Sequence, residues 1–111
     1  MLRDEKWIAY AVRTLKAVQG GTNTIARIAH EIGGSQSYLA KVIAVLRKGG
    51  LLNEQTELTR ALDSIFVSEL VALADPSPVE DTISQYINNA LLRGLSNLSV
   101  KQVLEDHEMV V

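Results

Sequence analysis

A short polar run beginning at Ser35 carries the side chains of this 111-residue chain that are best suited to chemistry. The run and the cations that follow it are Ser35, Gln36, Ser37, Lys41, Arg47 and Lys48. The Gln36 amide could pair with the N6/N7 edge of adenine in a major groove, and the cations could bind phosphate. In the simpler interpretation Ser35 caps a helix, Gln36 is exposed, and Lys48 complements the negative end of the helix.

Catalytic groups are not brought together by any motif. His30 and His107 are far apart in the sequence, and the chain has no cysteine. Glu80-Asp81 and Glu105-Asp106 are adjacent pairs, which would point roughly 100° apart on a helix. The absence of cysteine excludes disulfides, thiolate zinc sites and cysteine-ligated iron–sulfur clusters. We therefore expect no enzyme, no metal and no cofactor.

The elements that must position the polar run are three helices, each ended by a glycine pair. Apolar stripes at helical spacing run over Trp7–Val18, Ile25–Ile32 and Tyr38–Leu46. Thr22 or Thr24 could cap the second helix, whose predicted buried face is Ile25, Ile28, Ala29 and Ile32. Two short helices joined by a tight glycine turn form a helix-turn-helix, with the first helix behind them.

After Gly50 the pattern changes. The polar stretch Asn53–Glu57 between leucines predicts a short β-hairpin or ribbon, and a fourth helix is expected at about 66–74. Two prolines break the chain at 75–78. Beyond them a long helix is predicted to carry an apolar stripe of Val79, Ile83, Tyr86, Ile87, Ala90, Leu91 and Leu95. Asn97 or Ser99 opens a last short helix.

Charge is unevenly distributed although the net charge is only −2. Residues 1–60 hold nine lysines and arginines against five acids, whereas residues 61–111 hold two against eight. A basic front half and an acidic back half suit a module that presents one face to phosphates. Chance clustering of surface charge is the alternative.

No apolar run approaches the ~18 residues of a membrane span, and no signal-peptide pattern is visible. We therefore expect a cytoplasmic protein with no membrane partner. The length suits one domain, or one domain with an appended helix, and pairing with a second copy would add apolar burial.

Several segments resemble the Rrf-two family of winged helix-turn-helix transcription regulators, the IscR/NsrR-like proteins. Tyr10–Leu15 resembles the opening of the family, and Ile25–Glu31 is similar to its first helix-turn-helix element. Ser35–Ile43, followed by Leu46–Leu51, resembles the recognition helix and its exit. Leu58–Arg60 and Ile65–Val71 match the strand return and the next helix. The likeness covers nearly the whole chain.

The resemblance implies a homodimer that binds double-stranded promoter DNA with its third helix in the major groove. The expected fold is mainly α, a winged helix-turn-helix with a short β-ribbon wing and a long C-terminal dimerisation helix. Residues 1–75 would form the DNA-binding domain, and residues 76–111 the dimerisation helix and a short terminal helix. The expected DNA-binding residues are Ser35, Gln36, Ser37, Tyr38, Lys41, Arg47, Lys48 and Arg60. The expected dimer interface is the stripe from Val79 to Leu95.

Some assignments stay open at this point. Tyr38 could reach the DNA backbone or lie partly buried against the second helix. Arg60 could reach phosphate beside the ribbon, and Arg13 could bind phosphate or brace the domain.

The sequence departs from the family in two places. The cysteines that hold an iron–sulfur cluster in many members are absent, so cluster sensing is excluded. The glycine-rich wing is replaced by Asn53–Glu57, whose two acids would repel phosphate. The alternative function is therefore a wing-less winged helix that binds a partner protein. A regulator that senses an unidentified small-molecule or protein effector is compatible with the first function.

Overall fold

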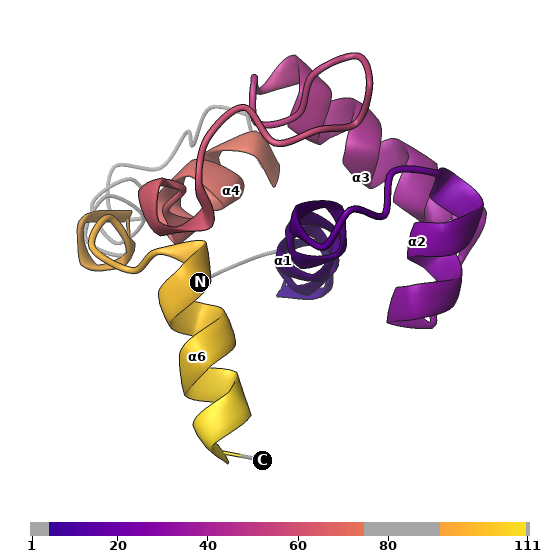
Figure 1. The fold of residues 1–111 in the computed structure, drawn as a ribbon. Helices are drawn as coiled ribbons and strands as arrows, with labels where there is room; N and C mark the ends of the chain where they lie inside the picture. Colours follow the sequence, from indigo (N-terminus) through magenta and orange to yellow (C-terminus); the bar gives the residue numbers. More distant parts are fainter. Residues whose placement is uncertain (1–4, 75–91, 111) are drawn as a thin grey trace.

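The computed structural model describes residues 5–74 and 92–110. Helix α1, Glu5–Gln19, buries most of the predicted stripe, including Trp7, Ala11 and Leu15, while Ile8 is partly buried. It ends where the Gly21 amide donates to the Val18 carbonyl, with Gly21 at a φ of 98°. In Figure 1 α1 lies between the α2–α3 pair and α4, and it packs against all three.

Helix α2, Ile25–Ile32, begins at Thr24, whose Oγ1 accepts a hydrogen bond from the Arg27 amide at 3.3 Å. Of the two candidate caps, the structure therefore uses Thr24. Ile28 and Ala29 are buried as predicted, and Ile32 is partly buried. The prediction for Ile25 was wrong, because its side chain is 37% exposed. Helical spacing places Ile25 on the same face as Ile28 and Ile32. At the first residue of α2, however, the core does not cover this face.

Helix α3, Gln36–Lys48, is capped by Ser35 and buries Leu39, Val42, Ile43 and Leu46. Its buried side faces α1, α2 and α4, which fixes the opposite side toward solvent. Helices α2 and α3 with their tight turn form the predicted helix-turn-helix.

The predicted ribbon is reduced to a single antiparallel bridge between Leu52 and Leu58. After it come a short 3-10 helix, η1, at Leu62–Ser64 and helix α4 at Val67–Ala74, close to the predicted 66–74. Leu70 and Val67 are buried in the common core.

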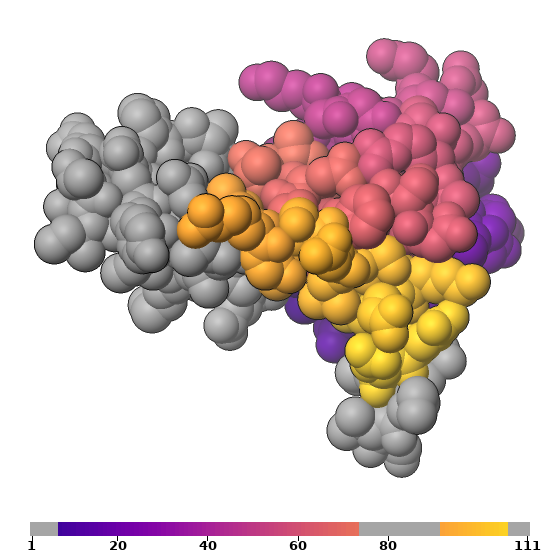
Figure 2. All heavy atoms as spheres, turned by 90° about the vertical axis from the view of Figure 1, so that its left-hand side faces the viewer, coloured from indigo at the N-terminus to yellow at the C-terminus, as the bar shows by residue number. Residues whose placement is uncertain are grey.

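The C-terminal part of the described chain joins this core. Residues 92–95 are helical, and helix α6 covers Val100–Val110. Ser99 caps α6 by accepting from the Gln102 amide at 3.0 Å, so Ser99 rather than Asn97 opens the last helix. The Val67 amide donates to the Leu98 carbonyl and the Val100 amide to the Ile65 carbonyl, both at 2.8 Å, which ties α6 to the start of α4 (Figure 2).

The predicted long helix lies mostly outside the described residues. Of its apolar stripe only Leu95 is described, and it is half-buried. Within the described helices none combines the length and apolarity needed to cross a membrane.

Candidate nucleic-acid interface

The first turn of α3 gathers short polar side chains on the surface. Ser35 Oγ accepts the Tyr38 amide at 3.3 Å and lies 2.9 Å from Ser37 Oγ. Ser35, Gln36 and Ser37 are all exposed. The cap bond occupies one of the otherwise unpaired amides of the helix start, while the partial positive charge there still favours an anion.

Packing behind α3 holds this turn in place. The Tyr38 ring meets the Tyr10 ring edge-on, with centroids 4.6 Å apart and planes at 75°. Gly34 lies directly under the Tyr10 ring, because a Cβ at Gly34 would come within 2.7 Å of Tyr10 Cε1. The Gly34 amide also donates to the Ala29 carbonyl at 2.9 Å, the bond that closes α2. The start of α3 is thus fixed to α1 through an aromatic contact. Tyr38 is half-buried, with its ring against Tyr10 of α1.

An exposed stripe runs along the outer side of α3. Ser37, Lys41, Ala44 and Lys48 follow one another at spacings of four, three and four, so they share one face of the helix. All four are exposed. Lys41 and Lys48 make no ion pair with another described residue. Ala44 was not among the site residues predicted from the sequence, although its spacing of three from Lys41 places the two residues on the same face. The methyl side chain of Ala44 does not project as far from the helix as the lysines on either side of it.

Arg47 lies about 100° around the helix from Lys48 and has protein partners. Its Nε donates to the Asn53 carbonyl at 3.3 Å, and its Nη2 donates to Thr56 Oγ1. Both partners belong to the turn that replaces the predicted ribbon. The structure therefore brings Arg47 to this turn, while Lys48 remains on the exposed stripe.

Arg60 also has protein partners. Its Nη1 and Nη2 each donate to one Glu69 carboxylate oxygen at 2.7 Å, and Nη2 also donates to the Ser64 carbonyl. The hydrogen bond from Arg60 lowers the pKa of Glu69, although desolvation opposes the shift. Glu69 Oε2 in addition accepts the Phe66 amide at 2.9 Å at the start of α4. The structure thus bonds Arg60 to α4 and to η1.

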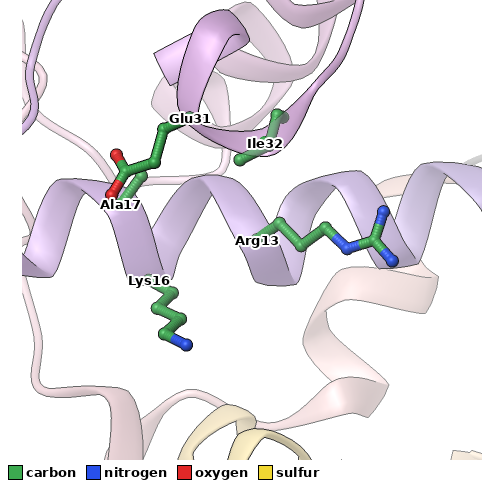
Figure 3. A pocket seen from close by; sticks show the side chains of 5 residues that line it. All are labelled: Arg13, Lys16, Ala17, Glu31 and Ile32. Atoms are coloured by element: carbon green, nitrogen blue, oxygen red, sulfur yellow. The ribbon is translucent and has the colours of Figure 1, made fainter. Parts of the chain in front are cut away.

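A shallow depression of about 260 Å³ lies between α1 and α2, and sequence reasoning gave no indication of it. Arg13 and Lys16 of α1 and Glu31 of α2 line it, with Ala17 and Ile32 between them. In Figure 3 Glu31 reaches over Ala17, while Arg13 and Lys16 extend in other directions. No local motif could reveal it, because its two helices meet only in the fold. Among the described residues, no three histidine or acidic side chains are grouped closely enough to hold a metal ion.

Solved structures that superpose on this chain confirm the mainly α fold expected from the Rrf-two resemblance, while the expected wing is reduced to one bridge and most of the expected long helix lies outside the described residues. IscR of T. potens superposes with a TM-score of 0.70 at 20% identity, covering 99% of this chain and 88% of that one. CymR of B. subtilis, a global cysteine regulator, gives 0.68 at 20% identity, with 93% and 96% covered.

CymR of Staphylococcus aureus gives a TM-score of 0.63 at 18% identity, covering 89% of this chain and 95% of that one. A further structure, described as a DNA-binding protein, gives 0.69 at 18% identity. By sequence alone the chain matches no protein-family model and no curated protein. At these identities the structural likeness establishes the fold.

Proposed function

We propose that this protein is a DNA-binding transcription regulator that acts as a homodimer and does not contain an iron–sulfur cluster. The observation that carries the proposal is the exposed polar first turn of α3, continued by the stripe from Ser37 to Lys48. An α-helix with such a face fits the major groove, where Gln36 can pair with adenine and the lysines can bind phosphate. The regulators that share the fold support the same function.

The proposed interface comprises Ser35, Gln36, Ser37, Tyr38, Lys41 and Lys48. Residues 1–75 would form the DNA-binding unit and residues 76–111 the dimerisation unit. Two copies related by a two-fold axis would place their recognition helices in successive major grooves, so the operator would be a palindrome with half-sites about 34 Å apart. Cysteine-ligated clusters are excluded by composition, because the chain has no cysteine.

The test is an anisotropy titration of the full chain against a pool of short duplexes at several salt concentrations. We expect one dimer per duplex, with affinity falling steeply as salt rises. The variant carrying Lys41→Glu and Lys48→Glu should lose at least about 100-fold in affinity, because two phosphate contacts become repulsions. The double variant of Arg93→Glu and Lys101→Glu is the matched control, since it makes the same four-unit charge change at two exposed cations outside α3.

The outcomes separate specific contact from general charge. Equal losses in the α3 double variant and in the Arg93→Glu and Lys101→Glu control would show that only net charge matters, and would contradict the proposed interface. No binding to any duplex at ~50 mM salt, where phosphate contacts are strong, would contradict DNA binding altogether.

The second candidate is a wing-less module that binds a partner protein. The exposed acidic residues of the turn, Glu54 and Glu57, favour it because they oppose phosphate. Under this function a pull-down with the α3 double variant should recover the same partner as the unmodified chain. Under the first function the α3 double variant loses its ligand.

A further inference from the structure

The turn formed by residues 53–57, hereafter the acidic turn, is held by several internal hydrogen bonds. Asn53 Oδ1 accepts the Gln55 and Glu57 amides at 3.0 and 2.9 Å, and Asn53 Nδ2 donates to Glu57 Oε1 at 3.0 Å. The backbones of Asn53 and Thr56 are joined by a further bond of 3.1 Å. These bonds satisfy the turn locally, so it has few polar groups left to rearrange around a ligand.

Thr56 shows that the turn is also fixed from outside. Its φ is 57°, a left-handed conformation that a β-branched residue rarely adopts, and its side chain is only 5% exposed. Such a conformation persists only where surrounding contacts determine it. The contact here comes from α3, because Arg47 donates to Thr56 Oγ1 and to the Asn53 carbonyl.

The acids and the lysines around the end of α3 lie on different sides of the helix. Glu54 and Glu57 are the only acids between residues 35 and 60, and both are exposed on the acidic turn. Arg47 joins that turn to α3 on a face about 100° from Lys48. A phosphate approaching the Arg47 side of α3 would therefore meet two carboxylates, whereas one approaching the Lys48 side would meet the exposed stripe.

We propose that Arg47 is a positioning residue that fixes the acidic turn, and that the turn keeps the DNA backbone off the Arg47 side of α3. Contact is thereby confined to the face of Ser37, Lys41 and Lys48, and the segment that follows α3 adds no phosphate contact. This inference rests on the proposed DNA-binding function and assigns Arg47 a role different from the phosphate contact predicted by sequence.

The first experiment compares neighbouring cations on α3. Lys48→Ala should reduce the slope of log K against log[salt] by about 0.9, the value for one lost phosphate contact. Arg47→Ala should leave that slope unchanged and should speed hydrogen exchange of the Thr56 and Glu57 amides. Arg47→Lys keeps the charge but lacks the planar fork that serves both acceptors, so it too should speed exchange. The Arg47→Lys variant also keeps the inference testable if Arg47→Ala folds poorly.

The second experiment removes the acids. The double variant of Glu54→Gln and Glu57→Gln keeps the oxygen that accepts from Asn53, so the turn should stay intact. We expect affinity for DNA to rise about threefold at low salt and the gain to shrink as screening increases. The double variant of Glu105→Gln and Asp106→Asn is the matched control, because both acids are exposed on α6, which Figure 1 shows on the other side of the molecule from α3.

The results distinguish a positioning role of Arg47 from a phosphate-binding role. A slope reduced by Arg47→Ala and restored by Arg47→Lys would make Arg47 a phosphate ligand and overturn the inference, while DNA binding itself would stand. An affinity gain from the Glu105→Gln and Asp106→Asn control equal to that from the Glu54→Gln and Glu57→Gln variant would overturn the local role of the acidic turn. Failure of the unmodified chain to bind any duplex would overturn both this inference and the proposed function.

Discussion

The two ends of α3 carry similar polar and charged residues but use them differently. At the first turn, Gln36 and Ser37 are exposed, and the main internal bond is the Ser35 cap. At the other end, Arg47 is bonded to the acidic turn, and Arg60, further along the chain, is bonded to Glu69. Three of the four cations predicted to bind DNA lie on α3, but only Lys41 and Lys48 lie on its exposed stripe.

This difference shows what makes a cation available to a ligand. An arginine presents five donors in a planar fork, so a nearby carbonyl, hydroxyl or carboxylate readily occupies it. The lysines of α3 make no hydrogen bond or ion pair with a side chain or carbonyl of the described residues. Availability is thus set by neighbours in space.

Replacing Gln36 with alanine should weaken DNA binding and leave the fold intact. A bidentate pair with adenine is worth about 1–3 kcal/mol of discrimination, so binding to the selected operator should weaken while binding to unrelated duplexes stays the same. Because Gln36 is exposed, stability should change by less than about 0.5 kcal/mol. Titration against both duplexes is the measurement, and an equal loss on both would show that Gln36 makes no base contact.

The Gly34→Ala variant should destabilise the fold by about 1–2 kcal/mol. The added Cβ would lie 2.7 Å from the Tyr10 ring, which would have to move away from Tyr38. Urea unfolding measures the loss. Gly21→Ala is a useful control because nothing lies within 4 Å of that position and only its φ of 98° opposes a side chain. Unchanged stability of Gly34→Ala would mean that the Tyr10 contact does not hold the start of α3.

Two variants at Ser35 should separate its capping role from its proposed ligand role. Ser35→Ala removes the cap and should cost about 1 kcal/mol of stability. Ser35→Asp keeps a capping oxygen and should preserve stability, while its negative charge at the helix start should weaken DNA binding. Thermal unfolding and titration of both variants give the comparison. If Ser35→Asp bound DNA with the affinity of the unmodified chain, the DNA backbone would not lie at the start of α3.

The Arg60–Glu69 pair should have the smallest effect, below about 1 kcal/mol, because the two side chains are 40% and 36% exposed. Since the pKa of Glu69 is lowered in the folded state, the contribution is present above the ordinary value of 4.5 and is lost as pH falls through the lowered pKa. Glu69→Gln should remove this pH dependence, as urea unfolding between about pH 3 and pH 6 would show. An identical acid dependence in Glu69→Gln and the unmodified chain would contradict the assignment.

Much of the helical framework could be predicted from apolar spacing and glycine stops. The caps at Ser35 and Thr24 and the start of α4 near Phe66 follow from local chemistry, and the structure has them there. Ile25 could not be predicted correctly, because its place in the stripe says nothing about whether a neighbouring element covers the end of α2. The predicted ribbon likewise became a single bridge, because the side chain of Asn53 closes the turn over so few residues.

The sequence by itself determined the order of the helices, the polar first turn of α3 and the exclusion of cysteine chemistry, since these depend on residue type and on spacing along one element. Only the tertiary structure decided which cations are available, because Arg47 and Arg60 meet partners six to nine residues away across a turn. It also decided that Tyr10 fixes the start of α3 from a different helix. Hydrogen bonds and ring contacts of this kind form between elements, and their geometry exists only once the core has set the distance between those elements.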